Sequence, residues 1–89
     1  MSVQLYAEKE MLRMKSAFEG VKVKDSTNKK AEEFKSFAQN YFEDGLYFYK
    51  EKKYEESFEA FIIAWAYIDI GLKLDFFSVP EEHKKWFTA

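Results

Sequence analysis

Two long apolar stripes that follow each other after a short break constrain this chain more than any other feature. Both stripes step by three and four residues in alternation, which is typical of amphipathic helices. Only Lys50 to Lys53 separates them, so we expect a helical hairpin with its aromatic faces opposed. The stripes consist of Ala31, Phe34, Ala38, Tyr41, Gly45 and Phe48, followed by Tyr54, Phe58, Phe61, Trp65, Ile68 and Leu72.

The segments on either side of the hairpin predict one further long helix and a short one. Residues 2–21 carry a narrower apolar stripe that begins behind the cap residue Ser2. Ser78, Pro80 and Glu81 have the order of cap, first turn and capping-box partner, which predicts a last helix. The fold class is therefore all-α, a three-helix bundle built on a long antiparallel helical hairpin, plus a short C-terminal helix. We expect one domain over residues 1–89, with helices at about 2–21, 27–52, 54–74 and 79–87.

Two details of the helices are also predicted. Asp25, Ser26 and Thr27 are each good cap residues for the second helix. Small side chains let another helix approach closely, so we expect the first helix or a second copy of the chain against a small-residue row of the third helix. That row consists of Ser57, Ala60, Ala64, Tyr67, Gly71 and Leu74.

The composition argues against catalysis and against bound cofactors. The chain has no Cys, so disulfides, thiolate nucleophiles and thiolate metal sites are excluded. His83, the single histidine, stands in a charged segment where we expect a solvated side chain, and no Glu-x-x-His pair of the kind used by carboxylate metal sites is present. The three Gly residues are scattered, so they form no phosphate-binding loop. We therefore expect a protein that is not an enzyme and that holds no cofactor and no metal.

Two carboxylates are candidates for a polar site. Asp69 interrupts an apolar run of the third helix, where an ion pair with Lys73 is the simpler use and orienting a Tyr or a ligand is the alternative. Asp44 lies beside Tyr41 and Tyr47 on the second helix. A hydrogen bond from a Tyr hydroxyl to Asp44 is expected to help specify the packing.

The hairpin is similar to two known helical patterns. Its spacing resembles that of one tetratricopeptide repeat, which we interpret as a packing solution that places Gly45 and Ser57 where the backbones come closest. The segments YFEDGLYF, KKYEESFEAF and AWAYIDIGLKL resemble the archaeal family known as domain of unknown function 357. This resemblance implies a small all-helical cytoplasmic protein from an archaeon, without an assigned activity. It is carried by Tyr41, Asp44, Phe48, Tyr54, Phe58, Ala64 and Asp69.

Aromatic residues make up 20% of the chain, more than a core of this size requires. Rings outside the core form exposed patches of the kind that mark binding surfaces. We therefore predict a non-enzymatic protein–protein interaction or scaffold module, with a homodimer as one way to cover the excess. The candidate partner-binding residues are Tyr47, Tyr49, Tyr67, Trp86 and Phe87. For the rings of the tail, folding over the open end of the bundle is the alternative.

The alternative function is weak nucleic-acid or nucleotide binding through residues 22–35. Phe34 and Phe37 would supply base stacking near a basic patch of Lys22, Lys24, Lys29, Lys30 and Lys35. For Phe34, packing towards the core is the simpler use of the ring, because it lies on the apolar stripe. A formal net charge of −2 and the presence of a single Arg, Arg13, argue against nucleic acid as the main partner. No apolar run is long enough to span a membrane, so we expect a cytoplasmic protein without membrane contact. The Lys- and Glu-rich composition resembles that of thermophile proteins.

Overall fold

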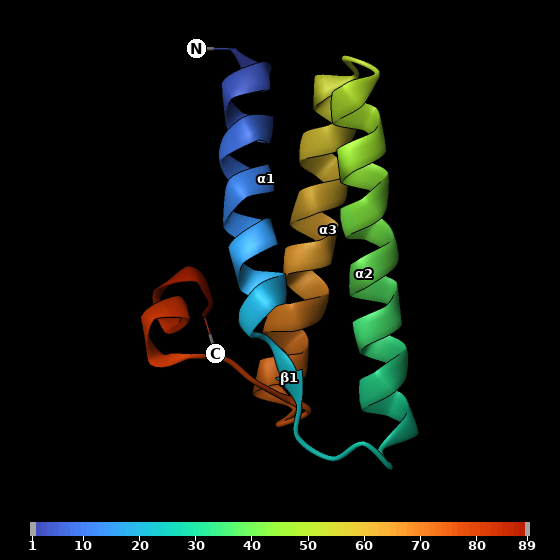
Figure 1. The fold of residues 1–89 in the computed structure, drawn as a ribbon, viewed down its shortest axis with the longest axis vertical. Helices are drawn as coiled ribbons and strands as arrows, with labels where there is room; N and C mark the ends of the chain where they lie inside the picture. The colour runs from blue at the N-terminus through green and yellow to red at the C-terminus, as the bar shows by residue number, and fades with distance from the viewer. Residues whose placement is uncertain (1, 89) are drawn as a thin grey trace.

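The protein is a three-helix bundle with a short two-stranded ribbon at one end (Figure 1). The computed structural model describes residues 2–88, so the ends of the domain predicted over 1–89 lie outside the described residues. In chain order the elements are α1 (Val3–Gly20), β1 (Lys22–Val23), α2 (Lys29–Lys50), α3 (Tyr54–Lys73), β2 (Phe77–Ser78) and the 3-10 helix η1 (Glu81–Trp86). The all-α fold class is confirmed.

Helix α3 lies between the other two helices and packs against both, whereas α1 and α2 touch each other little (Figure 1). The predicted division of its faces is wrong. The small-residue row contacts α2, because the Ser57 hydroxyl donates to the Gly45 carbonyl at 2.7 Å. Part of the aromatic stripe faces α1 instead, since the rings of Phe58 and Tyr6 lie 6.0 Å apart. Small residues on α3 thus admit the backbone of α2, as the spacing of Gly45 and Ser57 predicts.

Helices α2 and α3 both end without a glycine cap. Lys52 follows α2 with φ 62°, and Asp75 follows α3 with φ 63°. In each case the amide of the following residue donates a hydrogen bond to a carbonyl of the last helical turn. The Lys53 amide donates to the Phe48 carbonyl at 2.9 Å, and the Phe76 amide donates to the Gly71 carbonyl at 2.8 Å. This is the Schellman arrangement that satisfies the last carbonyls of a helix.

The short ribbon was not predicted from the sequence. Strands β1 and β2 pair antiparallel, with Lys22 opposite Ser78 and Val23 opposite Phe77. Phe77 is 1% exposed and completes a core made of Met14, Val21, Ala38, Phe42, Phe61, Ala64, Ile68 and Phe77. An added Cβ at Gly71 would lie 2.3 Å from Cε2 of Phe77, so the absence of a side chain at Gly71 makes room for this ring.

The predicted caps of two elements are wrong. Asn28 caps α2, with its side-chain oxygen accepting from the Ala31 amide at 3.1 Å. Asp25 instead accepts from the amide and the hydroxyl of Thr27, at 2.9 and 2.6 Å. Ser78 belongs to β2, because pairing with β1 holds it in an extended conformation. The 3-10 helix η1 therefore starts only after Pro80, and it has no side-chain cap.

Candidate functional site

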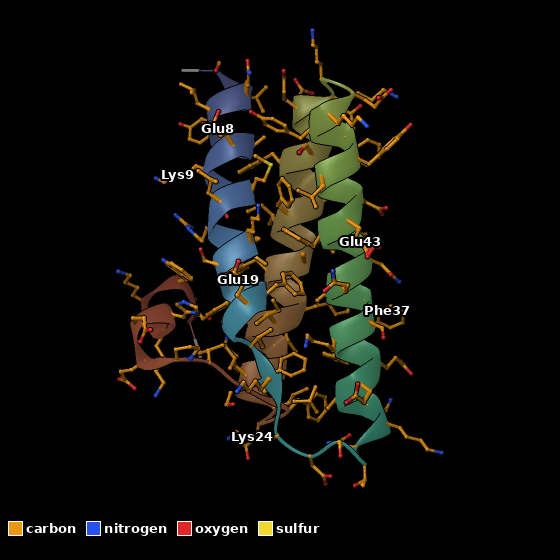
Figure 2. All side chains as sticks on the ribbon, viewed as in Figure 1. Glu8, Lys9, Glu19, Lys24, Phe37 and Glu43 are labelled. Atoms are coloured by element: carbon orange, nitrogen blue, oxygen red, sulfur yellow. The ribbon has the colours of Figure 1, made fainter. Side chains whose placement is uncertain are left out.

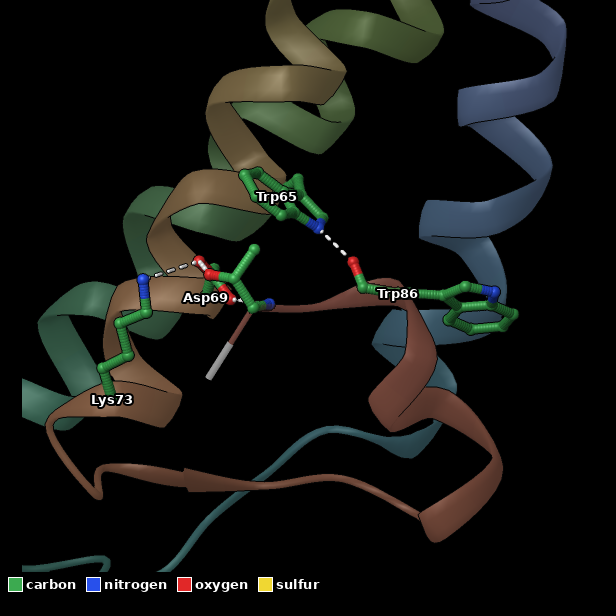
Figure 3. Close-up of polar contacts among 5 residues, drawn as sticks. Trp65, Asp69, Lys73 and Trp86 are labelled. Carbon is green, nitrogen blue, oxygen red and sulfur yellow. Dashed lines mark hydrogen bonds and ion pairs between the residues drawn. The ribbon is translucent and has the colours of Figure 1, made fainter.

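Asp69 anchors the segment that follows the bundle (Figure 3). Its side chain lies on α3 and the residue is 5% exposed. The carboxylate accepts from the Thr88 amide at 2.8 Å and from the Thr88 hydroxyl at 2.6 Å. The predicted pairing with Lys73 is confirmed, at 3.5 Å between Nζ and Oδ2. Because charge-assisted hydrogen bonds are stronger than those between neutral groups, Asp69 holds Thr88 firmly against α3.

A second polar contact holds the same segment one turn earlier on α3. The indole Nε1 of Trp65 donates to the carbonyl of Trp86 at 2.6 Å (Figure 3). Phe87 stacks on the Trp65 ring at a centroid distance of 6.2 Å and an interplanar angle of 7°. The rings of Trp86 and His83 stack at 4.5 Å. Both predicted tail residues therefore contact their own chain in this structure, and their binding of a partner stays a prediction.

Tyr67 and Tyr49 also have neighbours in their own chain. Tyr67 is half-buried among rings of α2, with the Tyr41 centroid 5.9 Å away and the Phe37 centroid 5.5 Å away. The Tyr49 hydroxyl donates to the Glu8 carboxylate at 3.2 Å. Partial burial raises the pKa of Tyr49, and the neighbouring Glu8 adds to the rise. These two Tyr residues join α2 to its neighbours.

Tyr47 is the most accessible of the five candidate partner-binding residues. The residue is 58% exposed on the outer side of α2, and the centroid of its ring lies 5.7 Å from that of the following Phe48. Glu43, one turn before Tyr47, projects outward from α2. Phe37, nearer the start of the helix, also projects outward (Figure 2). Tyr47 therefore offers an aromatic surface without any change of the fold.

Asp44 does not form the expected hydrogen bond with a tyrosine. Within residues 2–88, neither Tyr41 nor Tyr47 donates a hydrogen bond to its carboxylate, and Asp44 is exposed. It lines a shallow hollow of about 160 Å³ between α2 and α3, together with Tyr41, Phe48, Glu56, Glu59, Ala60 and Ile63. The helix places Asp44 on an exposed side of α2, so its carboxylate is accessible to solvent.

The predicted basic patch is spread over the end of the molecule that carries the ribbon. Lys22, Lys24, Lys29 and Lys30 are exposed, whereas Lys35 is half-buried. Lys24 forms an ion pair with Asp75, the residue in the turn after α3. A hollow of about 260 Å³ lies beside this ion pair and is lined by Lys24, Leu72, Asp75, Phe77, Ser78, Val79, Lys84 and Phe87.

The chain matches the family described as "Protein of unknown function (DUF357)" over residues 9–77. It belongs to the DUF357 family. No curated protein and no solved structure matches the chain. The family match includes α2, α3, Asp44, Asp69 and the Tyr candidates, and it ends at β2. Trp86, Phe87 and Thr88 follow the matched region, so in this DUF357 member the family part supplies the acceptor Asp69 and a later segment supplies the donor.

Sequence reasoning missed three polar features of this DUF357 member. Glu10 is 8% exposed and forms an ion pair with Arg13 at 3.1 Å. Its position between Ala7 and Met14 on the apolar stripe of α1 is the sequence signal for this burial. Thr88 carries no sequence signal as the donor to Asp69. His83 is half-buried rather than solvated, because η1 folds its ring against Gly20 and Trp86.

Metal clusters and membrane-spanning helices can be looked for directly among the described residues. In residues 2–88 no group of three or more His, Cys, Asp or Glu side chains is placed to hold a metal ion. Across the same residues, no helix is both long enough and apolar enough to cross a membrane.

Proposed function

We propose that this protein is a non-enzymatic helical module that binds another protein through the outer faces of its helices. The observation that carries the proposal is the exposure of large apolar side chains on all three helices. Leu5 and Leu12 of α1 are each 57% exposed, and Tyr47 of α2 is 58% exposed. Exposed apolar side chains of this kind are enriched at sites of protein association. A cytoplasmic location and an archaeal, thermophilic origin are part of this proposal.

The aromatic residues of α2 are the surface that we assign to a protein partner. Tyr47 and Leu46 are adjacent and both exposed, at 58% and 37%. Tyr supplies a large contact area at a low entropy cost, which is why such rings are frequent among the residues that dominate binding energy. Tyr49 of the same helix, and Tyr67, Trp86 and Phe87 elsewhere on the chain, are further candidate contacts for the partner.

A tagged pull-down with a matched pair of variants tests the proposal. We expect Tyr47→Ser to lose a protein that the unchanged chain captures from its source lysate after nuclease treatment. Glu43 is exposed one helical turn before Tyr47, and Glu43→Ser is expected to retain that protein. Equal capture by the two variants, or capture of no protein, would contradict the role of this surface.

Weak binding of nucleic acid or nucleotides by the basic patch is the second candidate. The observation that favours it is Phe37, which is 40% exposed and lies two helical turns after Lys30 on the same side of α2. An exposed ring beside Lys side chains is a stacking platform for a base. Binding of a single-stranded oligonucleotide that weakens steeply with added salt, and that is lost in Phe37→Ser, would support this function. Salt-independent binding would dismiss it.

A further inference from the structure

One side of α3 is covered by neither α1 nor α2. We call this side the outer row of α3, and it consists of Glu55, Glu59, Ile62, Ala66, Ile70 and Lys73. Ile62 is 38% exposed and Ile70 is 47% exposed, whereas Ala66 between them is half-buried. The row therefore has an acidic start, an apolar middle with a small residue at its centre, and a basic end.

The order of these residues is self-complementary about Ala66. Ile62 comes four residues before Ala66 and Ile70 four residues after it, while Glu59 and Lys73 stand seven residues before and after it. In an antiparallel pair of α3 helices, residues at equal distance from the centre lie opposite one another. Each Glu59 then faces the Lys73 of the other copy, and each Ile62 faces an Ile70.

We propose that a second copy of this chain packs antiparallel on the outer row of α3, with the two-fold axis at Ala66. This proposal rests on the proposed function as an interaction module and names one partner for it. A two-fold interface uses the same surface on both subunits, which is what a row with this symmetry provides. The methyl group of Ala66 at the axis lets the two backbones approach.

The parallel alternative is disfavoured by the same charges. It would place Glu59 against Glu59 and Lys73 against Lys73, and like charges held opposite each other oppose association. Lys73 keeps its contact with Asp69 in the single chain, and its side chain is still 53% exposed, so it can reach an acid of the second copy. Charge order therefore selects the antiparallel direction.

A hollow beside the outer row adds to the apolar surface that a second copy could contact. It has a volume of about 360 Å³, lies on the side of α3 that faces α1, and is lined by Val3, Glu55, Phe58, Glu59, Ile62 and Ile63. In the antiparallel pair, Ile70 of the second copy comes opposite Ile62 at the edge of this hollow. A helix of 20 residues is only about 30 Å long, so the interface is at the small end of the range for stable dimers. We therefore expect reversible dimers at micromolar concentrations or above.

Single introduced cysteines test the register, because the natural chain has none. Under oxidation at high protein concentration, Ala66→Cys is expected to link to itself across the axis. Glu59→Cys and Lys73→Cys are each expected to stay unlinked alone, since each residue would lie about 21 Å along the axis from its own mate. An equimolar mixture of the two should give the mixed dimer. Glu43→Cys, on the outer side of α2, is the control that reports random collision.

Two results would overturn the proposal. One is an Ala66→Cys protein that links no faster than the Glu43→Cys control. The other is self-linking of Glu59→Cys and of Lys73→Cys alone, which would mean a parallel pair. Each variant is first compared with the natural sequence by far-UV circular dichroism, so that a failure to fold is recognised.

A cysteine-free measurement keeps the proposal falsifiable if oxidation perturbs the chain. Glu59→Lys is expected to weaken dimerisation at least tenfold in sedimentation equilibrium at low salt, because it faces Lys73 of the second copy with a like charge. Glu43→Lys makes the same charge change off the interface and should leave the dimer within twofold of the natural sequence. A monomer up to millimolar concentration, or equal effects of the two variants, would refute the pairing.

The two proposals fail in different ways. If the chain is monomeric but Tyr47-dependent capture of another protein persists, the pairing through α3 is wrong and the interaction module remains. If the Ala66 linkage forms but no other protein is captured, self-association stands and the role of Tyr47 falls.

Discussion

Gly45→Ala is the sharpest test of how α2 and α3 fit together. An added Cβ at Gly45 would lie 2.4 Å from Cε1 and 2.6 Å from Cδ1 of Phe61. The ring of Phe61 is fully buried, so it has no free volume into which to move. Gly45 itself has an ordinary helical backbone, and the substitution therefore adds no backbone strain.

The expected loss of stability is the difference between two terms. Overpacking of a core costs about 1 to 3 kcal/mol, and a clash with several atoms of an immobile ring belongs at the upper end. Replacing Gly by Ala inside a helix returns about 1 kcal/mol. The free energy of unfolding should therefore fall by about 2 kcal/mol, which lowers the melting temperature of a domain of this size by about 8 to 16 °C.

Urea unfolding followed by circular dichroism measures this loss, and a double-mutant cycle identifies its cause. Phe61→Leu removes the ring atoms that the new Cβ would meet, so the double variant should be more stable than the sum of the single effects by about 1 to 2 kcal/mol. Glu43→Ala, an exposed change two residues earlier on α2, should stay within about 0.5 kcal/mol of the natural sequence. Additive effects of Gly45→Ala and Phe61→Leu would refute the packing argument.

Two further predictions concern polar contacts. Asp69→Ala leaves both donors of Thr88 without their acceptor, so it should cost about 1.5 to 3 kcal/mol and speed amide hydrogen exchange in residues 81–88. Asp69→Asn keeps one acceptor oxygen and should lose less in both measurements; equal losses would contradict this account. The hydroxyl of Thr27, and after it the Thr27 amide, lowers the pKa of Asp25 from 3.8. An NMR titration should find that the pKa of Asp25 lies closer to 3.8 in Thr27→Ala than in the natural sequence. Because the folded pKa is the lower one, this contribution to stability is present above pH 3.8 and is lost as the pH falls through the folded value.

The periodicity of the sequence predicts the helices because it reports which positions are buried. The ends of α1, α2, α3 and η1 lie within two residues of the expected bounds. The ribbon is different: two strands of two residues each carry no period, and they pair only because Phe77 enters the core beside Gly71. The stripe also predicts the wrong face of α3 for contact with α2, for a related reason. A stripe of large side chains indicates burial, but not which neighbour buries it.

The candidate site shows the same limit. The spacing of Asp69 and Lys73 predicts their ion pair because both lie on one helix, four residues apart. The contact of Asp69 with Thr88 joins residues far apart in sequence, and no local pattern encodes it. Proximity along α2 predicts a hydrogen bond between Asp44 and a tyrosine, whereas the direction of the Asp44 side chain leaves it facing solvent.

The segment after β2 determines which part of α3 is left for a second copy. Trp65 and Asp69 lie inside the region that matches the family, and their partners Trp86 and Thr88 come after it. Without that segment, a buried carboxylate and an indole N–H would lack these bonds, at a cost of about 1 to 3 kcal/mol each. The segment therefore covers α3 around Trp65 and Asp69, α1 packs beside it, and α2 covers the opposite side. The outer row around Ala66 is what remains uncovered, and its charges are ordered so that a copy of the row itself can cover it.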